Sequence, residues 1–184
     1  MAEELENLMY PIGREEEDRY ADKEYHAEIK NELCNHIKYF PAQLEYTIQN
    51  LDEHQLNTEY RPGGWTVGRL VHHTADSHIN AYVRFRLGLT EENPMIKPYD
   101  QDAWAVLPDV QTTPVNISVT LLHSLHTRWY NLLIALTDEN WQKTIFHPER
   151  KATLTLWDLL KSYSWHCRHH LAHIANLRER MGWK

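Results

Sequence analysis

Hydrophobic residues recur with helical spacing over four long stretches of the chain. Apolar side chains lie three or four positions apart in residues 22–50, and the same spacing returns in residues 67–87, 116–136 and 155–182. This spacing gathers the apolar side chains on one face of a helix, which must be buried against another element. Alternation with a period of two, which is typical of strands, is nearly absent. The pattern therefore predicts an all-α fold, a bundle of four helices.

Residues with strong preferences for helix ends support these boundaries. Thr66 follows a turn rich in Gly and Pro and can accept a hydrogen bond at the start of the second helix. Thr155 and Asp158 match a capping box at the start of the fourth helix, and Gly182 suits a left-handed C-terminal cap. Pro41 falls inside the first helical stretch and predicts a kink there.

The connection between the second and third helices is unusually long. Residues 89–115 contain four prolines and no strong periodicity. We interpret them as a crossover that lets the third helix run parallel to the second. Long loops in compact domains are often functional, so the crossover residues Tyr99, Asp100, Asp102 and Trp104 could roof a pocket. A loop that only covers the end of the bundle is equally consistent with the pattern.

Composition and charge narrow the class of protein. The 184 residues, 42% of them hydrophobic, suit a single domain spanning residues 1–184. Ten of the 26 acidic residues fall in residues 1–28, against three basic ones, so the net charge of −7 belongs to this part. We interpret residues 1–21 as an acidic arm, and the acidic run 15–18 as solvated side chains near a helix start. A basic surface is missing, so we expect no binding to nucleic acid.

The cellular location can also be predicted from composition. Two cysteines, Cys34 and Cys167, do not make a disulfide framework in a chain of this length. The first residues lack the basic and then apolar pattern of a signal peptide, and no apolar run approaches the roughly 20 residues of a membrane span. We therefore expect a cytoplasmic protein without membrane association.

A histidine-rich run near the C-terminus carries the strongest chemical signal. It contains His166, His169, His170 and His173 on the fourth predicted helix. Residues four apart lie on one side of a helix, so an inward pair can bind one metal ion. His170 falls in the centre of the apolar stripe and His166 at its edge, whereas His169 and His173 form a competing pair on a more polar side. The spacing therefore favours His166 and His170 as metal ligands over buried core histidines.

A third ligand is expected from another helix. A catalytic zinc has three protein ligands and one open position, whereas a structural zinc usually has four protein ligands. The second helix offers His72, His73 and His78. The apolar stripe points most directly at His78, and His73 lies beside it. Helical spacing alone leaves His73 and His78 open, with His72 as a weaker third choice.

Several motifs together resemble the DinB/YfiT family of metalloenzymes. They occupy residues 63–67, 72–78, 84–87, 89–92, 98–100 and 104, 165–174 and 181–183. The resemblance covers nearly the whole chain and agrees in order and spacing across three helices and the crossover. It implies an up-down-down-up four-helix bundle with one divalent ion per subunit, most often zinc and otherwise nickel, and a homodimer.

The resemblance also implies the ligand set. In this family the ligand of the second helix matches His73, and the ligands of the fourth helix match His166 and His170. All three positions are intact. Other candidates for the pocket around the ion are His78, Arg84, Asp100 and His169.

The activity is less sharply defined than the metal site. The family resemblance implies a metal-dependent hydrolase that activates water against a small molecule. The chain lacks the HExxH motif, because Cys167 follows His166, and weak candidates for a general base are Asp76, His78, Asp100 and His169. Cys167 itself is expected to be a small core residue. The alternatives are a thiol S-transferase of the bacillithiol type, which uses a low-molecular-weight thiol and no obligatory base, and a non-enzymatic module that the ion only stabilises.

Overall fold

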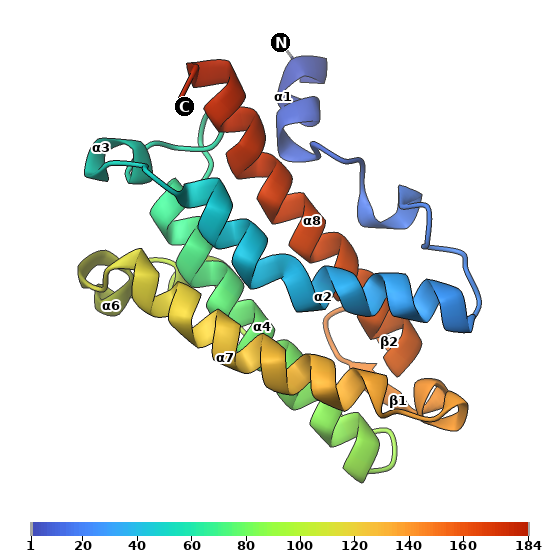
Figure 1. Ribbon diagram of the computed structural model, residues 1–184. Coiled ribbons are helices and arrows are strands. Elements are labelled where there is room, and N and C mark those ends of the chain that lie inside the picture. Colours follow the sequence, from blue (N-terminus) through green and yellow to red (C-terminus); the bar gives the residue numbers. More distant parts are fainter. Residues whose placement is uncertain (1, 184) are drawn as a thin grey trace.

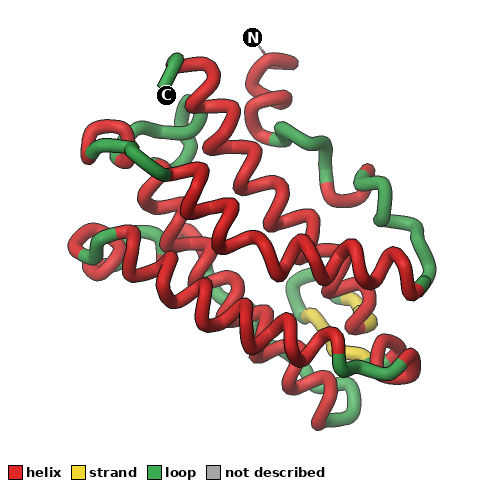
Figure 2. The backbone as a smooth tube through the Cα atoms, viewed as in Figure 1, coloured by secondary structure: helices red, strands yellow, loops and turns green. Residues whose placement is uncertain are grey.

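The computed structural model describes residues 2–183, and four long helices form its body (Figure 1). These helices are α2 (Ala27–Ile48), α4 (Val67–Thr90), α7 (Val115–Ile134) and α8 (Leu156–Met181). α2 and α4 each pack against both α7 and α8. α2 and α8 run in one direction and α4 and α7 in the other, which gives the up-down-down-up order (Figures 1 and 2). The predicted all-α bundle and its crossover are confirmed.

The helix ends follow the predicted capping residues. The Thr66 side chain accepts a hydrogen bond from the backbone N–H of Arg69 at 3.2 Å. Thr155 and Asp158 form a capping box in which each side chain accepts from the other residue's N–H at 3.0 Å. Gly182 ends α8 with a φ of 65°, the left-handed conformation that glycine adopts without steric cost.

Shorter elements connect the helices. The helical ones are α1 (Ala2–Met9), η1 (Glu15–Glu17), α3 (Glu53–Leu56), α5 (Gln101–Trp104), α6 (Pro108–Thr112) and η2 (Asp138–Gln142). Strands β1 (Thr144–His147) and β2 (Ala152–Thr155) form an antiparallel hairpin, which the sequence pattern did not predict. The strands are four residues each, too short for a clear alternation. The hairpin is also hydrogen-bonded to the crossover, because the N–H of Ile96 in the crossover donates to the carbonyl of Phe146 in β1 at 3.0 Å.

The core between the helices is rich in large side chains. Trp129, Trp141, Phe40 and Phe85 are fully buried. Burial of each such side chain contributes about 2 kcal/mol or more to folding. We expected Leu121 and Met181 on the buried faces of the third and fourth predicted helices, but they are 43% and 52% exposed.

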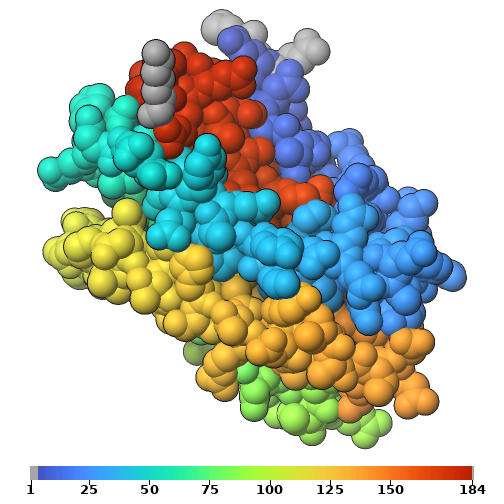
Figure 3. All heavy atoms as spheres, viewed as in Figure 1, coloured from blue at the N-terminus to red at the C-terminus, as the bar shows by residue number. Residues whose placement is uncertain are grey.

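The acidic N-terminal segment packs along α8. In the run 15–18, Glu16 and Glu17 are exposed as expected, whereas Asp18 is not. The Asp18 carboxylate pairs with Arg168 at 2.7 Å, and only 7% of the Asp18 side chain is exposed. Trp165 Nε1 donates to the carbonyl of Gly13, and Lys161 Nζ to that of Ala21. In the space-filling view the N-terminal residues lie against the C-terminal helix (Figure 3). The segment therefore packs against the helical body through these contacts.

Candidate metal centre

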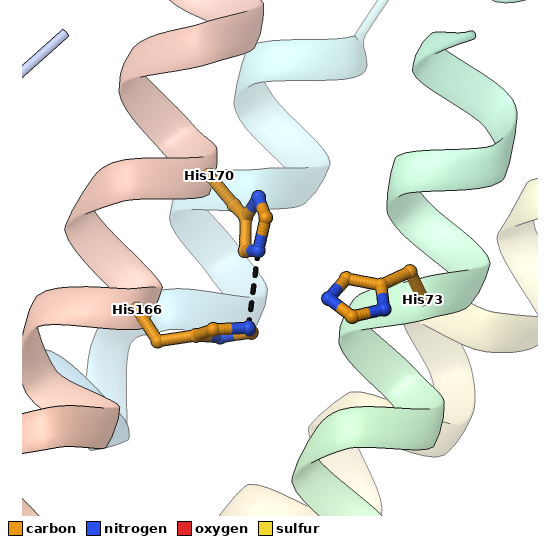
Figure 4. Close-up of side chains that lie close together, drawn as sticks. All are labelled: His73, His166 and His170. Carbon is orange, nitrogen blue, oxygen red and sulfur yellow. Dashed lines mark hydrogen bonds between the residues drawn. The ribbon is translucent and has the colours of Figure 1, made fainter. Parts of the chain in front are cut away.

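Three histidine side chains from two helices converge on one point (Figure 4). His73 comes from α4, and His166 and His170 come from successive turns of α8. One ring nitrogen of each lies within 4.8 Å of the other two. The Nε2 atoms of His166 and His170 are 3.0 Å apart. The geometry therefore selects His73, not His78, as the α4 member of the cluster.

The three imidazoles are held neutral by their surroundings. Burial, together with a smaller effect of nearby His169, lowers the pKa of His73 to about 4. Burial also places the pKa of His166 and His170 well below the ordinary value, with neighbouring imidazoles as the next cause. A neutral imidazole has a lone pair for a metal ion, so the set is ready to coordinate without first losing protons.

The donor set fits a divalent ion such as zinc. Three nitrogen donors at bonding distances of about 2.0–2.1 Å would lie roughly 3.3 Å apart around a tetrahedral ion. The His166 and His170 nitrogens are 3.0 Å apart, and that of His73 lies within 4.8 Å of both. Among the described residues no carboxylate or thiol joins this cluster. A fourth position would therefore be left to water or substrate, as in catalytic zinc sites.

A second histidine cluster overlaps the first. His169 and His173 have Nε2 atoms 2.9 Å apart and share His170 as a third member. The positive charge of Arg61 contributes to lowering the pKa of both His169 and His173, after burial. The same charge opposes a cation at this place. The electrostatics therefore favour the cluster that contains His73.

Behind His166 lies a row of buried side chains. The Nδ1 atom of His166 is 3.1 Å from Nε2 of His78, and His78 Nδ1 is 2.8 Å from Nε2 of His126. The Nδ1 atom of His126 is 2.5 Å from the carbonyl oxygen of Ile37. His78 is 0% exposed and is absent from the cavity wall, so it contacts His166 from behind and does not line the pocket.

The histidine centre lies in the wall of a cavity of about 680 Å³. This volume falls in the range for small-molecule sites. The crossover contributes Pro98, Tyr99, Gln101 and Asp102 to the wall, so the expectation that it covers a pocket holds for Tyr99 and Asp102. Trp104 does not line this cavity but packs on the Tyr99 ring, with centroids 4.4 Å apart.

The remaining candidates divide between the cavity and other roles. Arg84 and His169 line the cavity. Asp100 lies outside it, because its carboxylate caps α5 by accepting from the N–H of Ala103. His72 contacts Ser118 on the α7 side. Two further candidates, Asp76 and the buried thiol of Cys167, are likewise absent from the cavity wall.

Several cavity residues were missed by the sequence analysis. Glu15 from the N-terminal segment and His147, Glu149 and Arg150 from the β hairpin all line the cavity. Glu15 and Arg150 form an ion pair at 3.1 Å. These segments carry no periodic pattern, and their approach to the histidines depends on contacts between residues far apart in the sequence. No local signal could have placed them there.

Comparison with known proteins defines the class of this fold and site. The DinB superfamily profile matches residues 36–174, about three quarters of the chain. The chain therefore belongs to the DinB superfamily.

The relatives are similar over nearly their full length. The protein named "Putative metal-dependent hydrolase YfiT" from Bacillus subtilis (strain 168) is 45% identical over 96% of this chain and 97% of its own. A relative from Bacillus cereus (strain 03BB102) with a hydrolase name of the same kind is 46% identical over 97% of this chain and 100% of its own. A solved structure of Bacillus subtilis YfiT, described as a probable metal-dependent hydrolase with an unusual four-helix bundle topology, superposes with a TM-score of 0.91. It shares 44% identity and covers 97% of this chain and 99% of that one.

Within residues 2–183, the helices are all too short or too polar to cross a membrane.

Proposed function

We propose that this protein is a metal-dependent hydrolase of small molecules, with His73, His166 and His170 as ligands of one divalent ion. The observation that carries the proposal is the convergence of three neutral imidazoles, two buried and that of His166 partly buried, on one point in the wall of a cavity. The hydrolase names of the relatives support the same reading. When bound, the ion supplies Lewis acidity, which lowers the pKa of water or a thiol and polarises a substrate oxygen.

Aromatic side chains pack around the proposed centre and line the cavity beside it. The Trp65 ring packs against His73 with centroids 4.6 Å apart, and the Trp165 ring stacks on His169 at 4.3 Å. Tyr99 covers the cavity from the crossover side and His147 from the hairpin side. The contact with Trp65 fixes the orientation of His73 before substrate arrives, which lowers the entropy cost of reaching a reactive geometry.

Arg84 in the cavity wall offers a binding position for an anionic group of a substrate. Arg84 is half-buried, lines the cavity and donates to the hydroxyl of Tyr163 at 2.9 Å. Its Nε atom is buried without a hydrogen-bond partner, and none of the described carboxylates forms an ion pair with it. A guanidinium presents a fork of donors that matches a carboxylate or phosphate. We therefore propose a small substrate with such a group bound at Arg84.

One observation favours a thiol S-transferase as the second candidate. Among the base candidates from the sequence, only His169 lines the cavity, and burial lowers its pKa to about 4, so it is a weak base at neutral pH. Hydrolysis benefits from a base that accepts a proton from water. Attack by a thiolate does not require one, so a low-molecular-weight thiol is the alternative co-substrate.

Several finer expectations belong to the same proposal. Three imidazole ligands suit zinc best, and nickel is the second choice. We further propose one ion per subunit, a homodimer and a cytoplasmic location. Metal analysis of the purified protein and light scattering after size exclusion measure the first two.

The decisive assay offers the zinc-loaded protein two sets of substrates. One set contains esters and amides without thiol, and the other combines a low-molecular-weight thiol with electrophiles. We expect hydrolysis without thiol, lost in His170→Ala and retained in the control His54→Ala, an exposed position. Turnover only in the presence of thiol would contradict the hydrolase proposal and support a thiol S-transferase. Chelation that unfolds the protein, with no turnover in either set, would indicate an ion that only stabilises the fold.

A further inference from the structure

We propose that a buried chain of hydrogen bonds, from the carbonyl oxygen of Ile37 through His126 and His78, fixes the tautomer of His166. The chain leaves the lone pair of His166 on Nε2, the nitrogen that faces His170 and the metal centre. This inference rests on the proposed role of His166 as a ligand. It assigns positioning roles to His126, His78 and Pro41, which lie outside the cavity wall.

The chain begins at a gap that proline leaves in α2. In an α-helix each N–H donates to the carbonyl four residues earlier, and proline has no N–H. Pro41 lies inside α2, so the carbonyl oxygen of Ile37 loses its donor within the helix. Ile37 is 0% exposed, and the Nδ1 atom of His126 lies 2.5 Å from this oxygen. A histidine of α7 therefore satisfies the carbonyl that Pro41 leaves free.

The carbonyl sets the direction of every following hydrogen bond. A carbonyl oxygen only accepts, so His126 must carry its proton on Nδ1 and keep its lone pair on Nε2. That lone pair accepts from Nδ1–H of His78 at 2.8 Å. The lone pair on Nε2 of His78 then accepts from Nδ1–H of His166 at 3.1 Å. His166 is left with a lone pair on Nε2, as metal coordination requires.

The surroundings keep the chain rigid and dry. His78 is 0% and His126 1% exposed, so water does not compete for their nitrogens. Phe40 packs against both rings, with centroids 4.9 Å from His78 and 5.5 Å from His126. Trp129 contacts the same two rings at 5.8 and 5.5 Å. The sulfur of Cys167 lies 3.9 Å from His78 Nε2, and because a thiol is only a weak donor and a weak acceptor, it does not displace His166 as the partner of this nitrogen.

Interrupting the chain has a defined consequence. In His126→Leu, Nδ1–H of His78 has no acceptor, so His78 can carry its proton on Nε2 instead. That proton would face Nδ1 of His166 and move the His166 proton to Nε2. Partners that orient a ligating histidine typically change metal affinity by about 10–100-fold when removed. In His126→Gln the amide offers both an acceptor and a donor, so it can replace the imidazole.

The test combines tautomer assignment with zinc affinity. Nitrogen-15 NMR of the metal-free wild type should show His126, His78 and His166 each with the proton on Nδ1. Competition with a chromogenic chelator should show zinc binding about 10–100-fold weaker in His126→Leu and restored in His126→Gln. The control is His123→Leu, an exposed position one turn earlier on α7. Circular dichroism of each variant checks that the bundle is folded.

Each outcome separates this proposal from the ligand assignment. Protonation of His78 or His166 on Nε2 in the metal-free wild type would overturn the proposal, and so would unchanged zinc affinity in a folded His126→Leu. If His126→Leu does not fold, the tautomers of the wild type decide. If the tautomers are as expected but His73→Ala and His170→Ala bind zinc normally, the metal-site assignment fails and the hydrogen-bond chain stands.

Discussion

The guanidinium of Arg84 donates a hydrogen bond to the hydroxyl of Tyr163, with the two atoms 2.9 Å apart. The Tyr163 ring in turn packs against His166, with ring centroids 6.0 Å apart. This contact joins a cation on α4 to the helix that carries two of the proposed metal ligands. A substrate anion bound at Arg84 would therefore lie beside the centre.

Removal of the Arg84 charge should weaken binding of anionic substrates selectively. A hydrogen bond to a charged group contributes about 1.5–3 kcal/mol, which corresponds to a KM about 10–100-fold higher in Arg84→Gln. The KM of a neutral substrate should change little. The matched control is Arg86→Gln, because Arg86 donates to Tyr82 in the same way on the exposed side of α4. Equal effects on charged and neutral substrates would contradict an anion-binding role.

Acid should destabilise the metal-free protein between about pH 6.5 and pH 4. Burial lowers the pKa of His126 to about 4 and that of His173 to about 3. In this range the unfolded chain binds protons that the folded chain refuses, so stability is present above pH 6.5 and lost as the pH falls. Each such histidine accounts for up to about 3 kcal/mol of this loss in the free energy of unfolding.

Urea titrations with a chelator at several pH values measure this loss. His126→Gln replaces one of these groups by an amide that does not titrate, and it should lose less stability than the wild type on acidification. A free energy of unfolding that stays constant from pH 7 to pH 4.5 would show that the buried histidines do not control acid stability.

Two glycines of α4 should respond to alanine with opposite signs. A Cβ atom at Gly88 would lie 2.8 Å from Leu156 Cδ2 and 3.0 Å from Ile145 Cγ2, both in the core. Gly88→Ala should cost about 1–3 kcal/mol by overpacking. At Gly68 the nearest atom is the Leu56 carbonyl oxygen at 3.4 Å, so Gly68→Ala should stabilise by up to about 1 kcal/mol through helix propensity. Thermal unfolding of both variants measures the difference, and a stabilising Gly88→Ala would contradict the packing.

The fold could be predicted because each long helix carries its own evidence in its spacing and its caps. Capping residues act locally and are visible in the sequence, as with Thr66, which accepts from the backbone N–H of Arg69. The β hairpin and the docking of Asp18 on Arg168 were not visible. They depend on contacts between distant segments, and a four-residue strand carries too little pattern to identify.

At the candidate metal centre, helical spacing predicts how deeply a histidine is buried and does not predict which histidine faces the metal site. Spacing pointed to His78 because His78 is indeed the more deeply buried residue, at 0% exposure against 4% for His73. Depth does not define a ligand, since His78 contacts the far side of His166 and His73 faces its metal-binding side. Family resemblance separated the two where spacing could not. The role of Pro41 was read only as a kink, because the partner of its free carbonyl is on another helix.

The central claim is that the ion is held by His73, His166 and His170, and one pair of variants tests it directly. His73 belongs only to this cluster, and His173 only to the overlapping cluster with His169 and His170. Equilibrium dialysis of zinc should give one tightly bound ion per chain for the wild type and for His173→Ala, and loss of tight binding for His73→Ala. One tightly bound ion in His73→Ala, with binding lost in His173→Ala, would contradict the account and place the ion in the other cluster.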